Sequence, residues 1–258
     1  MELLTQLVGF DLVPGSSSTG YDDTGGGRDP GQTGQTKQLP GVHLPYGRRP
    51  MAKTLSLADA AATTGTGDVW LFRGHSPADR VIRFATNSPI NHVGMAVAID
   101  DLPPLLWHGE LGRSLPDVWT GTRKRGPQLH RLEDAVSTWV HRYGQRAWFR
   151  QIDIEATREM EDAALAAINE LVDRPFPKAL SLGVRWVKGR FRRPVSFEDL
   201  YCAEQVALTY QRMGLLNGDR PPNWYDPGRF WSGDRLELIG AALGPEIEIV
   251  DVPPLAKR

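Results

Sequence analysis

The sequence predicts an α+β domain that runs from about residue 55 to residue 258. Forty per cent of the 258 residues are hydrophobic and eight are Trp, which is enough apolar material for one sizeable core. Short apolar runs bounded by glycine or turn residues indicate strands, and two longer segments have the periodicity of helices. No internal repeat interrupts this pattern, so we expect both element types to share one core.

The first 54 residues are expected to form a largely disordered N-terminal arm. From Pro14 to Pro50 the sequence is dominated by Gly, Ser, Thr, Asp, Gln and Pro, with almost no aliphatic periodicity. Such a segment buries too little apolar surface to offset the entropy that ordering costs. The apolar residues before Pro14 either fray or dock on the domain as a short amphipathic stretch, and we favour fraying. Order is expected to begin near Leu55.

Two strands with a helix between them are predicted at the start of the domain. Residues 68–73 form a short apolar run between Gly67 and Gly74, as expected for a buried strand. In residues 92–99 bulky side chains alternate with His, Gly and Ala. This two-residue period predicts a strand with one crowded face and one face open to close approach. Residues 76–85 are expected to be helical.

The same criteria predict further strands at residues 105–108, 148–154 and 246–252, the first as an antiparallel partner of the 92–99 strand. Two long helices are predicted with them. Residues 157–172 carry an apolar stripe and begin at Thr157, a candidate N-cap. The second helix is expected from about residue 197 to 213, with Gly214 at its C-terminal end.

Composition excludes several classes of function. Thirty basic and 31 acidic residues leave a formal charge of −1, so no general attraction to nucleic acid is expected. No run approaches the roughly 18 apolar residues of a membrane span, and the N-terminus lacks the features of a secretory signal. A cytoplasmic protein without a transmembrane segment is therefore the expectation. Neither a phosphate loop nor metal-ligand spacing is present, so no cofactor or metal is expected.

The single cysteine, Cys202, is the first candidate for chemistry. It falls within the first two turns of the second helix, where free amide N–H groups and the helix dipole favour negative charge. A thiol there is expected to ionise more readily, which suits a nucleophile. The alternative is that Cys202 is a small buried hydrophobic residue, as most lone cysteines are.

His92 is the candidate base, because imidazole titrates near neutrality without large perturbation. It opens a strand that carries small residues on the same face, which leaves room for a partner and a substrate. A Cys-His pair also needs a third polar group to orient the ring. His108 and Glu110 follow on the next strand, both on one face by strand alternation. Structural or solvated histidines at strand ends are the alternative interpretation.

Three motifs in order resemble a known family: residues 67–74 (GDVWLFRG), residues 86–95 (TNSPINHVGM) and residues 201–204 (YCAE). They are similar to the Gly-Asp strand, the Ser-His-Val-Gly strand and the late cysteine helix of the circularly permuted NlpC-type papain-like proteins, the YiiX/YebB-like branch. The order His before Cys matches the permuted branch. The resemblance covers roughly residues 60–216.

By that resemblance the fold is papain-like, with a central antiparallel sheet packed against helices that include the one bearing the nucleophile. Cys202 corresponds to the nucleophile and His92 to the general base. His108 stands where a Glu is common in the permuted branch, although unpermuted relatives often have His there. Glu110 remains a substitute, so the orienting residue is open between the two.

The resemblance implies a thiol hydrolase that cleaves an amide or ester through an acyl-enzyme. A thiol acyltransferase with lipid or amine acceptors and a catalytically silent papain-like binding module are the alternatives. The substrate is expected to be a small molecule, a peptide or a lipid. Residues 185–193 combine five cations with two aromatic residues. They form either a lip for peripheral membrane contact or a solvated connection, and we favour the latter.

Overall fold

The computed structural model describes residues 54–100, 102–110, 112–172, 202–234 and 236–255. All of these belong to one compact unit, residues 52–258. The predicted N-terminal arm up to residue 53, the basic segment at residues 185–193 and the expected first turn of the second helix lie outside the described residues.

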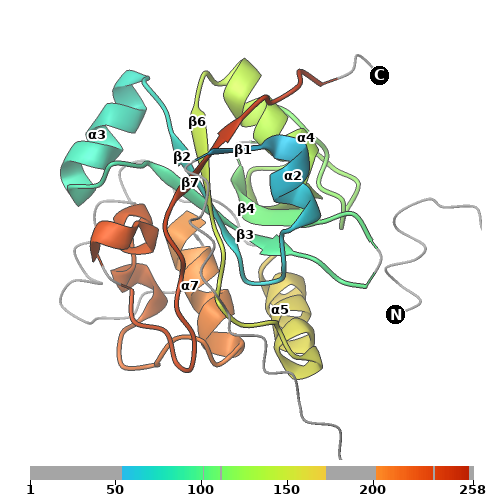
Figure 1. Cartoon of the computed structure of the whole chain (residues 1–258), viewed down its shortest axis with the longest axis vertical. Coiled ribbons are helices and arrows are strands. Elements are labelled where there is room, and N and C mark those ends of the chain that lie inside the picture. Colours follow the sequence, from blue (N-terminus) through green and yellow to red (C-terminus); the bar gives the residue numbers. More distant parts are fainter. Residues whose placement is uncertain (1–53, 101, 111, 173–201, 235, 256–258) are drawn as a thin grey trace, which may run out of the picture. The chain divides into compact units, whose positions relative to one another are not determined.

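The centre of the unit is a seven-stranded sheet in the order β1-β7-β6-β2-β3-β4-β5 (Figure 1). The strands are β1 (Thr54–Ser56), β2 (Val69–Arg73), β3 (His92–Val97), β4 (Leu105–Glu110), β5 (Gly126–Arg131), β6 (Arg146–Arg150) and β7 (Ile247–Val250). With its helices, the sheet confirms the predicted α+β class. Its pairs are antiparallel except β1 with β7, which is parallel. The expected antiparallel sheet is therefore corrected at this edge, where strands from the two ends of the unit meet without a hairpin to fix their direction.

Helices cover both faces of the sheet. On one face lie α2 (Leu57–Ala62), α4 (Leu132–Ser137) and the π-helix η1 (Thr138–Arg142), which pack on an apolar core that includes Trp70, Phe72 and Phe149. On the other face lie α5 (Arg158–Leu171) and α7 (Cys202–Arg212), side by side in Figure 1. A hydrogen bond of 3.1 Å from Trp107 Nε1 to Thr209 Oγ1 ties α7 to β4 on this second face.

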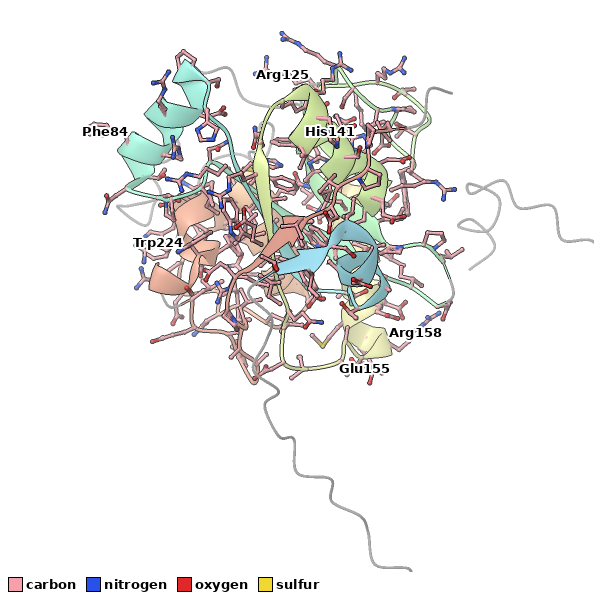
Figure 2. All side chains as sticks on the ribbon, turned by 45° about the horizontal axis from the view of Figure 1, so that its top comes forward. Phe84, Arg125, His141, Glu155, Arg158 and Trp224 are labelled. Carbon is pink, nitrogen blue, oxygen red and sulfur yellow. The ribbon has the colours of Figure 1, made fainter. Side chains whose placement is uncertain are left out.

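The remaining helices are short or peripheral: α3 (Pro77–Thr86) and the 3-10 turns η2 (Pro222–Trp224), η3 (Pro227–Phe230) and η4 (Ser232–Asp234). The α3 helix begins with a complete capping box between Ser76 and Asp79. Phe84 on α3 is 91% exposed and points away from the sheet in Figure 2.

The predicted elements reappear with shifted ends. Thr157 caps α5 by accepting a hydrogen bond from the Met160 amide, as expected. Gly214 follows α7 with a φ of +76°, a conformation that favours glycine and ends the helix. The strand predicted at residues 148–154 lies at 146–150 instead, and beyond it only Ile152 forms an isolated bridge, to Leu243. The strands β1 and β5 and the helices α2 and α4 were not predicted.

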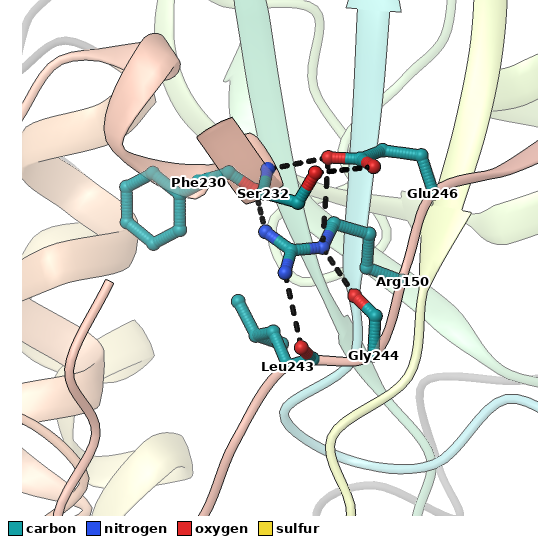
Figure 3. A network of polar contacts seen from close by, with 6 residues as sticks. All are labelled: Arg150, Phe230, Ser232, Leu243, Gly244 and Glu246. Carbon is teal, nitrogen blue, oxygen red and sulfur yellow. Dashed lines mark hydrogen bonds and ion pairs between the residues drawn. The ribbon is translucent and has the colours of Figure 1, made fainter. Parts of the chain in front are cut away.

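A buried arginine joins the C-terminal segment to the sheet. The guanidinium of Arg150, at the end of β6, donates to the carbonyls of Phe230, Leu243 and Gly244 at 2.5, 3.0 and 2.6 Å (Figure 3). Glu246 adds an ion pair at 3.9 Å and accepts hydrogen bonds from the backbone and hydroxyl of Ser232. These contacts hold the loops after α7 against the face of the sheet on which α7 packs.

Candidate active site

Three histidines form a hydrogen-bonded row across neighbouring strands. His92 is the first residue of β3, His108 lies in β4 and His130 lies in β5. Nε2 of His92 is 3.2 Å from Nδ1 of His108, and Nε2 of His108 is 2.9 Å from Nδ1 of His130. The register of the strands places all three rings on the face that α4 and η1 cover. The row therefore begins at the predicted base and runs toward the sheet edge.

Burial keeps these rings neutral. It lowers the pKa of His92 to about 3 and that of His108 well below its usual value, where the neighbouring His130 and His92 add a smaller effect. The pKa of His130 is also lowered by burial. Nearby Glu110 and Asp117, the Leu115 carbonyl and Asp134 partly oppose that effect. Near neutral pH each ring consequently carries one proton and no charge.

Trp139 packs over the histidine row on the face of the sheet where the row lies. Its ring stacks on His92 with a centroid distance of 4.0 Å and an interplanar angle of 12°. Gly94, between the strands, leaves no spare room, because an added Cβ would lie 2.9 Å from Leu106 Cδ1 and 3.0 Å from His108 Cβ. The sequence predicted a face open to close approach with room for a partner and a substrate; His108 is that partner, and at Gly94 no further room is left. The small residues let Leu106 and His108 pack closely.

Cys202 lies at the same end of β3 as His92. It lies in the described part of α7, which covers Cys202–Arg212; the expected start of this helix lies outside the described residues. Backbone N–H groups of Val93, Ala203 and Cys202 itself act on the thiol and favour its thiolate. Because Val93 directly follows His92 in β3, the thiol lies near the backbone at the end of β3 where His92 begins.

Burial outweighs the effect of these backbone N–H groups on the thiol. Cys202 is 6% exposed, and burial raises the pKa of its thiol to about 11, with a smaller contribution from the Asp226 carboxylate. The expected ease of ionisation is therefore wrong for this conformation, although the N–H donors behind the expectation are present. No hydrogen bond within the described residues joins Sγ to the His92 ring. Neutral thiol and neutral imidazole are the resting forms.

The structure places His108, not Glu110, against His92. Glu110 has other partners: its carboxylate accepts hydrogen bonds from the Gly112 amide at 2.9 Å, the Arg113 amide at 3.3 Å and the Tyr143 hydroxyl at 2.9 Å. It stabilises the turn after β4 and acts on the row through its negative charge. Of the two orienting residues left open by the sequence, His108 makes the contact that the role requires.

His130 and Trp139 were missed by the sequence analysis. The segment containing His130 has Pro, Gln and Arg as neighbours and no apolar alternation, so no strand was assigned to it. The alternation of the polar residues Gln128 and His130 was the one signal in the sequence that could have indicated a strand here. Trp139 sits in a π-helical turn, which sequence periodicity does not reveal.

In the described parts of the chain, no group of three or more His, Cys, Asp or Glu side chains is arranged to hold a metal ion. The three histidines do not converge on a common point, because their facing nitrogens bond one another. A bilayer-spanning helix, long and apolar enough for that purpose, is likewise absent among the described helices.

Comparison with known proteins gives little guidance. No family model and no curated protein matches the chain. Among solved structures, it is similar to the crystal structure of the metalloprotein YiiX from Escherichia coli O157:H7, with 18% sequence identity and a TM-score of 0.40. The match covers 58% of this chain and 66% of that chain, which is just under two thirds of its length. The site is therefore interpreted from its own geometry.

Proposed function

We propose that this chain is a thiol hydrolase with a permuted papain-like core, which cleaves an amide or ester through an acyl-enzyme on Cys202. One observation supports the proposal: the thiol on α7 interacts with the amide that follows His92, whose ring heads a buried row of histidines. A nucleophile, a base and an orienting group are the three parts that such catalysis needs.

In the first half of the reaction, Nδ1 of His92 takes the thiol proton as Sγ bonds to the substrate carbonyl carbon and the carbonyl π electrons move to oxygen. Backbone N–H groups at the start of α7 stabilise that oxyanion. The imidazolium then gives its proton to the leaving amine or alcohol as the C–N or C–O bond breaks. Because both resting groups are neutral, proton transfer accompanies attack rather than preceding it.

In the second half, His92 takes a proton from water as its oxygen attacks the thioester. The C–S bond breaks, a free acid leaves, and the proton returns to sulfur. A thiol acyltransferase would use a lipid hydroxyl or an amine in place of that water. The buried site favours exclusion of bulk water, which is the condition that a transferase needs. Product analysis separates the two.

The test is acylation of the full-length chain by activated esters and arylamides of short and long acyl chains, followed by intact-mass measurement. We expect an acyl adduct on Cys202 that is absent in Cys202→Ala, with free acid as the product. His141→Ala is the matched control, because His141 is exposed and its ring is hydrogen-bonded to the Val252 carbonyl, at 2.7 Å.

Three outcomes distinguish the alternatives. Free acid released without an acceptor supports the hydrolase. Product that forms only when a lipid or amine acceptor is added supports the acyltransferase. If neither the adduct nor free acid forms with any ester or arylamide, the enzyme proposal is wrong and the binding module is left.

A further inference from the structure

The histidine row admits only two orders of protons. Each neutral imidazole has one N–H donor and one bare nitrogen acceptor. If Nε2 of His92 donates to His108, then Nε2 of His108 must donate to His130, and the remaining nitrogen of His92, Nδ1, is bare. In the opposite order every donor is reversed and Nδ1 of His92 carries the proton. One end of the row therefore determines the tautomer at the other end.

The environment of His130 distinguishes the two orders. Nε2 of His130 is buried and has no hydrogen-bond partner within the described structure, whereas Nδ1 bonds His108. The carboxylates of Glu110, Asp117 and Asp134 and the Leu115 carbonyl act on this ring as negative charges and partial charges that favour its protonated form. The Leu115 carbonyl falls short of a hydrogen bond of normal geometry but acts in the same direction. Such surroundings favour an N–H at Nε2 over a bare lone pair.

Hydrogen bonds hold these carboxylates in place, so their electrostatic effect on His130 is fixed. Asp117 is fully buried and accepts hydrogen bonds from the Leu129 amide at 2.6 Å and from the Thr120 amide at 2.7 Å. Glu110 is fixed by the turn amides and by Tyr143. Because β5 carries both His130 and the amide that holds Asp117, the charge keeps its position relative to the ring.

We propose that His130 is a positioning residue that sets the tautomer of His92, with the proton on Nε2 and a bare Nδ1. The role of this tautomer in catalysis rests on the proposed function, because an unprotonated Nδ1 can take the thiol proton. The tautomer itself does not depend on that function. His130 acts on His92 only through His108, at two hydrogen bonds' distance.

The test is a long-range proton–nitrogen NMR spectrum of the imidazole nitrogens at neutral pH, recorded on the full chain and on Cys202→Ala. We expect His92 to carry its proton on Nε2 in both. His130→Phe removes the acceptor for His108 and is expected to mix the two tautomers of His92. In His130→Asn the amide oxygen can occupy the place of Nδ1 and accept from His108, so this variant should restore the single tautomer.

The rate of Cys202 acylation should change in the same order as the tautomer of His92. We expect His130→Phe to lose about tenfold in the rate of Cys202 acylation, and His130→Asn to recover most of that loss. His141→Asn, the exposed control, should change neither the tautomer nor the rate. If His130→Phe fails to fold, the unmodified chain and His130→Asn still show whether the proton of His92 lies on Nε2.

A proton on Nδ1 of His92 in the unmodified chain would overturn the proposal, as would an unchanged tautomer in a folded His130→Phe. Failure of the proposed function gives a different result, since acylation would be absent while Cys202→Ala still shows the expected tautomer. NMR therefore tests the tautomer proposal, and acylation of Cys202 tests the proposed function.

Discussion

The two faces of the sheet each bury a polar cluster, and the clusters differ in how completely they are bonded. On the α7 face, the Arg150 guanidinium is matched by three carbonyls and a carboxylate. On the η1 face, the histidine row is neutral and ends at a nitrogen without a partner. A fully bonded buried charge fixes structure, whereas neutral rings with unused capacity can move protons. We therefore assign a structural role to the Arg150 cluster, and the proposed function gives the histidine row a role in proton transfer.

The strongest test of the comparison is Arg150→Met. It leaves the three carbonyls without their donor and Glu246 without its cation, so we expect the free energy of unfolding to fall by about 3 to 5 kcal/mol. Denaturant unfolding measures this. The variant should keep the His92 tautomer if it folds, because the row lies on the other face. A loss below about 1 kcal/mol would contradict the structural role given to this cluster.

A second test removes the cover of the row. Trp139 is 8% exposed, and Trp139→Leu should cost about 2 to 4 kcal/mol of stability through the cavity it leaves. The same change admits water beside the imidazole. The pKa of His92 should then rise from about 3 toward its ordinary value, which NMR titration of the ring follows. An unchanged pKa in a folded variant would show that Trp139 does not control solvation of this ring.

The pH dependence of stability tests the neutrality of the row. The three histidines have lowered pKa values when folded, so the unfolded chain binds more protons below about pH 6.5 and stability falls as the pH falls. Asp68 opposes this, because burial raises its pKa to about 7 and its contribution grows as the pH falls toward 4. The three histidines lower stability in acid and Asp68 raises it, so we expect the free energy of unfolding to fall by on the order of 1 to 2 kcal/mol between pH 6.5 and 5.5.

Urea unfolding at both pH values measures that loss, and Asp68→Asn provides the control. Removing the opposing carboxyl should make the loss of stability in acid steeper. A stability that stays flat or rises toward pH 5.5 in both proteins would mean that the histidines are not held neutral in the folded state.

The smallest effect is expected at the other arginine of β6. Arg146 pairs with Glu248 at 2.5 Å, but the two side chains are 51% and 31% exposed. Arg146→Ala should therefore cost less than about 1 kcal/mol, and the cost should shrink further at high salt. Measured beside Arg150→Met, it shows whether burial, rather than the presence of an ion pair, decides the contribution of an arginine in this strand.

Local patterns were enough to predict β2, β3, α5 and most of the described part of α7, because each has an apolar period or a cap. The strand β5 was missed since its buried residues are polar and bond across strands, so no hydrophobic alternation marks them. His92, His108 and Cys202 could be nominated from motif and spacing. Their pKa values could not be, because burial comes from tertiary packing that a local argument does not contain.

The π-helical turn has a consequence for engineering. A π-helix holds about one more residue per turn than an α-helix, and Trp139, which stacks on the His92 imidazole, lies in the π-helical turn η1. Deleting a single codon from this turn would let the helix relax into regular α geometry and swing the indole by roughly 100° about the axis. A shortened gene would thus move the indole away from the His92 ring while keeping the residue, whereas Trp139→Leu removes the indole itself.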